Sequence, residues 1–75
     1  MRKATVRWFD SATASGWQTA PQTALFECET TGYVAHKDKK AIVVCLNLSL
    51  SASQNPIGDA ITIPMCVVRS VKYFK

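Results

Sequence analysis

The residue types best suited to ligand chemistry cluster between residues 10 and 22, in a segment of small and polar side chains. Asp10, Ser11 and Ser15 precede Trp17 in this segment. An indole ring stacks on flat ligands, and a carboxylate or hydroxyl beside it can bond the edge of a base or a ribose. The segment is therefore expected to be a ligand-binding loop. A capped turn that folds Trp17 over the core is the alternative explanation.

Positive side chains elsewhere in the chain would complete a site for an anion. Nine Lys and Arg residues outnumber five Asp and Glu residues, which gives a net charge of +4 and a pI near 9.2. We expect Arg7, His36 and Arg69 to join the Trp17 loop in binding a small anionic ligand of the nucleotide type. Ordinary solubility charge and protection of strand edges would explain the same residues.

A second basic group lies in the middle of the chain. Lys37, Lys39 and Lys40 flank Asp38 in a stretch that is typical of a turn. In a nucleic-acid-binding protein such lysines follow the phosphates while aromatic rings stack on the bases. The alternative prediction is therefore a barrel that binds single-stranded RNA or DNA.

The remaining reactive side chains show no catalytic or metal-binding pattern. His36 is the one histidine of the chain, and no Cys-x-x-Cys pair is present. Glu27 and Glu29 alternate on one strand face, which is typical of a solvated surface. We therefore expect a protein that is not an enzyme and that holds no metal and no cofactor.

Length and composition limit the architecture. The chain has 75 residues, of which 48% are hydrophobic, so residues 1–75 are expected to form a single domain with a real core. A large enzyme with separate cofactor and substrate domains is excluded. No apolar run approaches the roughly 20 residues of a membrane span. Three cysteines cannot all pair within one chain, which favours reduced thiols and a cytoplasmic location.

A domain of this size without disulfides or a metal has a marginal core. Oligomerisation is the remaining way to stabilise it. The sequence thus predicts a homo-oligomer.

Hydrophobic residues alternate with a period of two, and no helical period extends over three turns. Residues 41–50 show the clearest alternation, with Ile42, Val44, Leu46, Leu48 and Leu50 on the core face. The expected strands cover residues 3–9, 24–36, 41–50, 60–63 and 66–74. The fold class is therefore mainly β.

Gly32 interrupts the second of these strands. A hairpin turn centred on Asp38 and Lys39 would place Glu27 and Glu29 on the core face, opposite Leu48 and Leu50. One extra residue at Gly32 would correct this register and send both carboxylates to solvent. We therefore expect a bulge at Gly32 that bends the strand, with Phe26 and Cys28 packed near Leu50 and Leu48.

Five strands, a bent second strand and a proline-containing link before the last strand resemble the Sm-like five-stranded small barrels. The resemblance lies in the arrangement of residues 24–74, above all in the stretch from Gly58 to Val68 that breaks at Pro64 and re-enters. It implies a small barrel with a long first loop that has room for a short helical turn. The chain lacks the initial helix of Sm proteins and their Asp-x-x-Met-Asn signature, so the resemblance does not extend to ring assembly or uridine binding.

The start of the chain also resembles small phage-type proteins. The matching residues are Trp8-Phe9-Asp10-Ser11-Ala12 and Gly16-Trp17. This resemblance implies a phage or mobile-element origin.

These observations together predict a non-enzymatic binding module. Its expected ligand is a small anionic nucleotide-type molecule, and a phage protein of this kind could sequester a host defence signal or hold a host protein. A single-stranded nucleic-acid-binding barrel is the first alternative, and a structural or protein-interaction subunit is the second. No membrane partner is expected.

Overall fold

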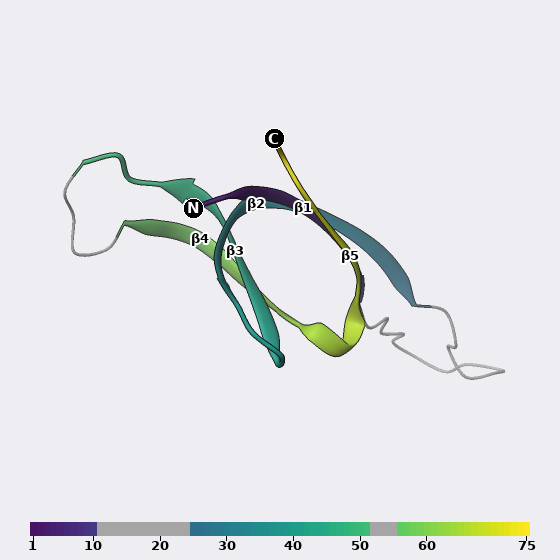
Figure 1. Cartoon of the computed structure of the whole chain (residues 1–75). Helices are drawn as coiled ribbons and strands as arrows, with labels where there is room; N and C mark the ends of the chain where they lie inside the picture. Colours follow the sequence, from purple (N-terminus) through teal and green to yellow (C-terminus); the bar gives the residue numbers. More distant parts are fainter. Residues whose placement is uncertain (11–24, 52–55) are drawn as a thin grey trace, which may run out of the picture.

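The computed structural model describes residues 1–10, 25–51 and 56–75 of the chain. Regular structure in these ranges consists of β-strands and one short 3₁₀ helix, in the order β1 (Lys3–Asp10), β2 (Phe26–Lys37), β3 (Ala41–Leu48), β4 (Ile57–Pro64), η1 (Met65–Val67) and β5 (Val68–Tyr73). The strands form one antiparallel sheet with the order β4-β3-β2-β1-β5 (Figure 1). The expectation of a mainly β fold is confirmed.

The strand boundaries differ from the sequence-based ones most clearly at the two ends of β4. β4 begins at Ile57 rather than at residue 60, because Gly58 pairs with Asn47 in β3. The Asn47 amide also donates a hydrogen bond of 2.5 Å to the Asp59 carboxylate. At the other end of β4, the expected strand of residues 66–74 divides into η1 and β5.

The short link through η1 joins the two edge strands of the sheet. Edge strands of a flat five-stranded sheet would lie about 19 Å apart, at about 4.8 Å per strand. The four Cα steps from Pro64 to Val68 span at most about 15 Å, and the 3₁₀ turn makes them shorter. The sheet must therefore curl so that β4 and β5 approach each other at η1, as Figure 1 shows.

The hydrophobic core fills the inside of this curl. Val6, Ile42, Val44 and Ile63 are fully buried and form one cluster. Half-buried side chains from both ends of the sheet pack against it, namely Trp8, Val34, Met65, Val67, Val68 and Val71. Side chains of β4 and β5 could not meet in one cluster on a flat sheet, so the core depends on the curl.

Gly32 lies where β2 changes partner. Residues 26–33 of β2 pair with β1, and Tyr33 is the first residue to pair with β3. A Cβ on Gly32 would contact the Cys45 carbonyl oxygen and would lie 2.9 Å from Val44 Cγ1. The sequence-based expectation that a glycine is needed here is consistent with this close approach of β3.

The expected bulge at Gly32 is wrong, and so is the expected register of the β2–β3 hairpin. Val34 pairs with Val44 and His36 with Val43, so the extra residue of β2 is Ala35.

The partners expected for Phe26 and Cys28 are also wrong. These residues pair with Asp10 and Trp8 of β1, and Phe26 is exposed. Glu27 and Glu29 are nevertheless exposed, as expected, because each lies opposite a residue of β1 that is not buried, Phe9 or Arg7.

Candidate functional site

The outward side of β1 carries the side chains from which the candidate site is built. Ala4 and Val6 point into the curl and are buried, so the alternation of the strand sends Lys3, Thr5 and Arg7 to the opposite side. A contact across the β1–β2 pair confirms that Thr5 faces outward together with Thr31, because their hydroxyls lie 2.9 Å apart.

Two neighbouring strands extend this outward side into a surface. Thr5 pairs with Lys72 of β5, and Arg7 pairs with Ser70 of β5 and Glu29 of β2. Phe74 N–H donates to the Lys3 carbonyl at 2.8 Å, which continues the β1–β5 ladder by one residue pair. We call this surface the outer face; its members are Lys3, Thr5, Arg7, Phe9, Glu27, Glu29, Thr31, Tyr33, Arg69, Ser70, Lys72 and Phe74.

A cation lies beside an aromatic ring at each end of the outer face. Lys3 Nζ lies 5.3 Å from the centre of the Phe74 ring, and the Arg69 guanidinium lies 5.2 Å from the centre of the Phe9 ring. Each contact is a cation–π pair that holds a long basic side chain over a neighbouring strand. The two pairs stand at opposite ends of β1, and Lys72 lies between them.

The charge of the outer face is uneven along β1. Arg7 Nε donates to Glu29 Oε2 at 3.2 Å, and both side chains are more than half exposed, so solvent screens much of this pair. Glu27 lies opposite Phe9 at the same end of β1. The two carboxylates therefore lie near the C-terminal end of β1, whereas the N-terminal end, with Lys3 and the neighbouring Lys72, carries cations.

A shallow depression of about 320 Å³ opens beside Arg7. Glu27, Cys28 and Glu29 complete its lining among the described residues. Two carboxylates against one guanidinium give this depression a negative balance, which disfavours a phosphate. It is a poor site for a small anion, whereas the lysine-rich end of the outer face attracts one.

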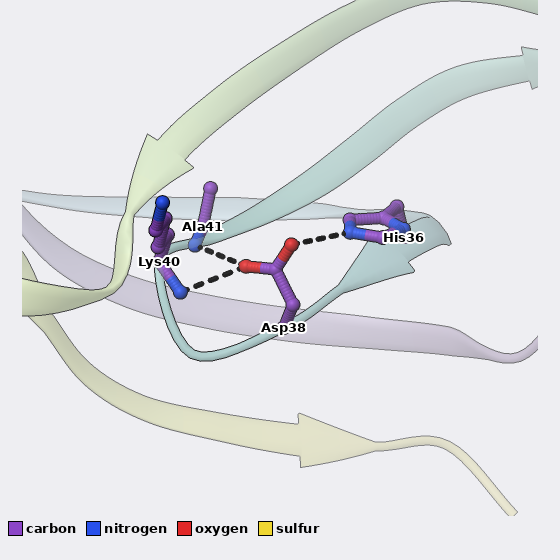
Figure 2. Close-up of polar contacts among 4 residues, drawn as sticks. All are labelled: His36, Asp38, Lys40 and Ala41. Carbon is purple, nitrogen blue, oxygen red and sulfur yellow. Dashed lines mark hydrogen bonds and ion pairs between the residues drawn. The ribbon is translucent and has the colours of Figure 1, made fainter.

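His36 lies near the end of β2, next to the β2–β3 turn (Figure 2) and beyond the residues of β2 that pair with β1. Its Nε2–H donates to Asp38 Oδ2 at 2.7 Å, and the other carboxylate oxygen accepts the N–H groups of Lys40 at 2.7 Å and Ala41 at 2.9 Å. The hydrogen bond from His36, followed by those two backbone bonds, lowers the pKa of Asp38 to about 2. His36 is thus the partner of a turn carboxylate that stabilises the hairpin.

The structure brings together only part of the expected ligand site. Arg7 and Arg69 share the outer face, and Asp10 ends β1 directly after Phe9. His36 is not with them. The other expected ligand residues, Ser11, Ser15 and Trp17, lie outside the described residues.

The lysines of the alternative nucleic-acid site, Lys37, Lys39 and Lys40, are exposed around the β2–β3 turn. In Figure 1 this turn lies at the opposite end of the curled sheet from the C-terminus. These lysines therefore do not extend the basic end formed by Lys3 and Lys72.

Sequence reasoning missed Lys3, Lys72, Tyr33 and Phe74 as site residues. The outward alternation of β1 already placed Lys3 beside Thr5 and Arg7. Nothing in the local pattern showed that β5 would be the neighbour of β1, which is what adds Lys72 and Phe74.

Within residues 1–10, 25–51 and 56–75, no three His, Cys, Asp or Glu side chains are close enough to hold a metal ion. The three thiols are free, with Cys45 buried and Cys66 exposed. In the same part of the chain, no helix has the length and apolar character required to cross a membrane.

Comparison with protein-family models, with curated proteins and with solved structures found no match for this chain.

Proposed function

We propose that this protein is a non-enzymatic module that binds single-stranded nucleic acid on the outer face of β2, β1 and β5. The observation that supports the proposal is the pairing of a cation with an aromatic ring at each end of that face, Lys3 with Phe74 and Arg69 with Phe9. Proteins that bind single strands combine a basic track for the backbone with rings on which bases stack.

The dimensions of the outer face suit a few nucleotides. From Lys3 to Phe9 the strand rises about 20 Å, at about 3.4 Å per residue. Phosphates would lie near Lys3 and Lys72, where no carboxylate of the described residues pairs with either lysine. Glu27 and Glu29 would repel the backbone at the other end and so give the bound strand a preferred position.

We further propose that the curled sheet closes into a small Sm-like barrel. The short η1 link between β4 and β5 and the shared core of residues from both edges support closure. A closed barrel would hold the three strands of the outer face rigidly, which lowers the entropic cost of binding an extended ligand.

A small nucleotide is the second candidate ligand. Arg69 lies over Phe9, directly before Asp10 and the segment that contains Trp17, so a ring and a cation stand at the start of the predicted ligand loop. Sequestration of a nucleotide signal would use this end of the outer face. Polymer binding would use its whole length.

Fluorescence anisotropy with labelled single-stranded RNA and DNA of mixed sequence tests the proposal. The variant Lys3→Gln/Lys72→Gln removes two cations from the outer face, and Lys39→Gln/Lys40→Gln removes two from the β2–β3 turn as a matched control. We expect the outer-face variant to reduce the slope of log K against log salt by about 1.4, or about 0.7 per lost phosphate contact, while the control retains the slope.

The aromatic contribution is tested by Phe74→Ala against Phe26→Ala. Their exposed fractions are similar, 49% and 58%, but Phe26 lies off the outer face. Loss of one stacked base should weaken binding about 5- to 150-fold for Phe74→Ala, which corresponds to about 1–3 kcal/mol. Equal effects of the two aromatic variants, or of the two lysine variants, would overturn the proposed site. Binding of a mononucleotide as tight as that of a 12-mer, with little salt dependence, would favour the second candidate.

A further inference from the structure

The β3–β4 hairpin extends beyond the rest of the sheet. Tyr33 and Cys45 form the last pair between β2 and β3, and past this point β2 follows β1 instead. Asn47 and Leu48 of β3 therefore pair with β4 alone. We call residues 46–48 and 57–61 the arm, which projects from the curled sheet in Figure 1.

One side of the arm is apolar and open to solvent. Leu48 pairs with Ile57 and Val44 pairs with Ile61, so these residues share the side of the sheet that forms the core. Leu46 lies between Val44 and Leu48 on the same side and is 59% exposed. Ile57 and Ile61 are also exposed. The arm thus continues the core surface past the point where the other strands cover it.

The arm is also nearly free of charge. All nine Lys and Arg residues lie outside residues 41–64, and Asp59 is the one charged residue within that stretch. Its carboxylate accepts a hydrogen bond from the Asn47 amide. Exposed strands are usually protected from association by charges, above all by lysines, and the arm has none.

The near absence of charge on the arm indicates which kind of partner can bind it. A nucleic acid would find no cation on the arm, and a strongly charged protein surface would lose hydration there without a counter-charge. Two copies of this chain, each with a net charge of +4, repel wherever their basic surfaces meet. The arm is an apolar surface on which two copies can approach without bringing lysines or arginines together.

We propose that the apolar side of the arm packs against the same side of a second copy and forms a two-fold symmetric dimer. A two-fold interface uses the same patch on both subunits, which requires a self-complementary surface such as this uncharged aliphatic one. Pairing of β4 edges is the less suitable geometry, because Asp59, the third residue of β4, has a φ of 54° and interrupts the extended backbone.

The size of the arm determines the expected affinity. A few aliphatic side chains offer less than the roughly 800 Å² per partner of a standard stable interface. We therefore expect a dissociation constant in the micromolar range. The interface is apolar, so association should persist or strengthen at high salt.

Sedimentation velocity of the purified protein between about 1 and 200 µM, with reductant present, tests the dimer. The variant Leu46→Lys places a charge in the centre of the apolar side. The control Leu25→Lys makes the same change at a leucine that is 61% exposed and lies outside the arm. We expect the unchanged protein and the Leu25→Lys variant to dimerise, and the Leu46→Lys variant to remain monomeric to the highest concentration while keeping the β-type circular dichroism spectrum.

Three results would overturn the proposal. A monomeric unchanged protein at 200 µM would show that the arm does not self-associate. A dimer that persists in Leu46→Lys would indicate pairing of strand edges or another surface. A dimer that appears only without reductant would indicate a disulfide through exposed Cys66. Retention of nucleic-acid binding by monomeric Leu46→Lys would show that the two proposals stand independently.

Discussion

Replacement of Gly32 by alanine should destabilise this protein, although the same change in an ordinary strand stabilises it. Glycine in a strand costs roughly 0.5–1 kcal/mol relative to alanine, so a solvent-exposed strand glycine gains stability from a methyl group. At Gly32 the methyl group would collide with the Cys45 carbonyl oxygen and lie 2.9 Å from Val44 Cγ1 and 3.2 Å from the Cys45 carbonyl carbon. The steric cost of the methyl group and the gain in backbone propensity therefore oppose each other. The closeness of the Cys45 backbone decides whether the substitution lowers or raises the free energy of unfolding.

The magnitude follows from which atoms would have to move. Two of the three nearest atoms belong to the backbone of β3, which is paired with β2 at Cys45 and with β4 at Ala60. The collision can therefore be relieved only by shifting two strand pairs. Overpacking of this kind costs about 1–3 kcal/mol, and we expect a value near the upper end. For a domain of this size, about 3 kcal/mol lowers the melting temperature by about 12–24 °C.

Urea unfolding and thermal melts followed by circular dichroism measure the effect. Gly58→Ala is the matched control, because its methyl group would meet the Asn47 side chain at 3.3 Å rather than a backbone carbonyl. We expect the control to change stability by less than about 1 kcal/mol. A melting temperature of Gly32→Ala equal to or above that of the unchanged protein would refute the argument that β3 crosses β2 so closely.

Three further predictions concern the turn, the core and the thiols. The ionised Asp38 carboxylate stabilises the folded state at any pH above about 4, the pKa of this group in the unfolded chain, because its pKa is lowered to about 2 on folding. Asp38→Asn should therefore lower the melting temperature at pH 5–7, and the difference from the unchanged protein should shrink as the pH falls from 4 towards 2. A difference that does not change with pH would contradict an ionised carboxylate in the turn. Ile63→Ala should cost about 2–5 kcal/mol in urea unfolding because Ile63 is fully buried, whereas Ile61→Ala should cost clearly less because Ile61 is exposed; equal losses would count against the described core. Mass spectrometry of brief thiol alkylation should find Cys66 modified in the folded protein and Cys45 only after unfolding, and early labelling of Cys45 would show that it is not enclosed.

The sequence determined the local features of the fold. Alternation of apolar and polar residues has a period of two in any strand, so Lys3, Thr5 and Arg7 could be placed together and opposite Ala4 and Val6 without knowledge of the neighbours. The special role of Gly32 was also visible, because an isolated glycine in a strand pattern marks a close approach or a bend.

The register of the β2–β3 hairpin was decided by hydrogen bonds in the turn, which the sequence pattern did not reveal. Asp38 accepts the N–H groups of Lys40 and Ala41 and so fixes the turn around residues 38–41, while Ala35 takes the bulge. A glycine and a lysine-rich turn were compatible with more than one register, and hydrogen bonds between residues far from the glycine selected one. The sequence-based bulge at Gly32 was wrong for this reason.

The candidate site was likewise decided by the order of the strands. Lys72 and Phe74 lie beside Thr5 and Lys3 only because β5 pairs with β1, more than sixty residues earlier in the chain. The exposed arm has the same origin: the alternation of Ile42, Val44 and Leu46 is uniform along β3, yet Ile42 and Val44 are buried and Leu46 is exposed. Periodicity states which side of a strand faces inward, but only the extent of the neighbouring strands determines how far along that side the core continues.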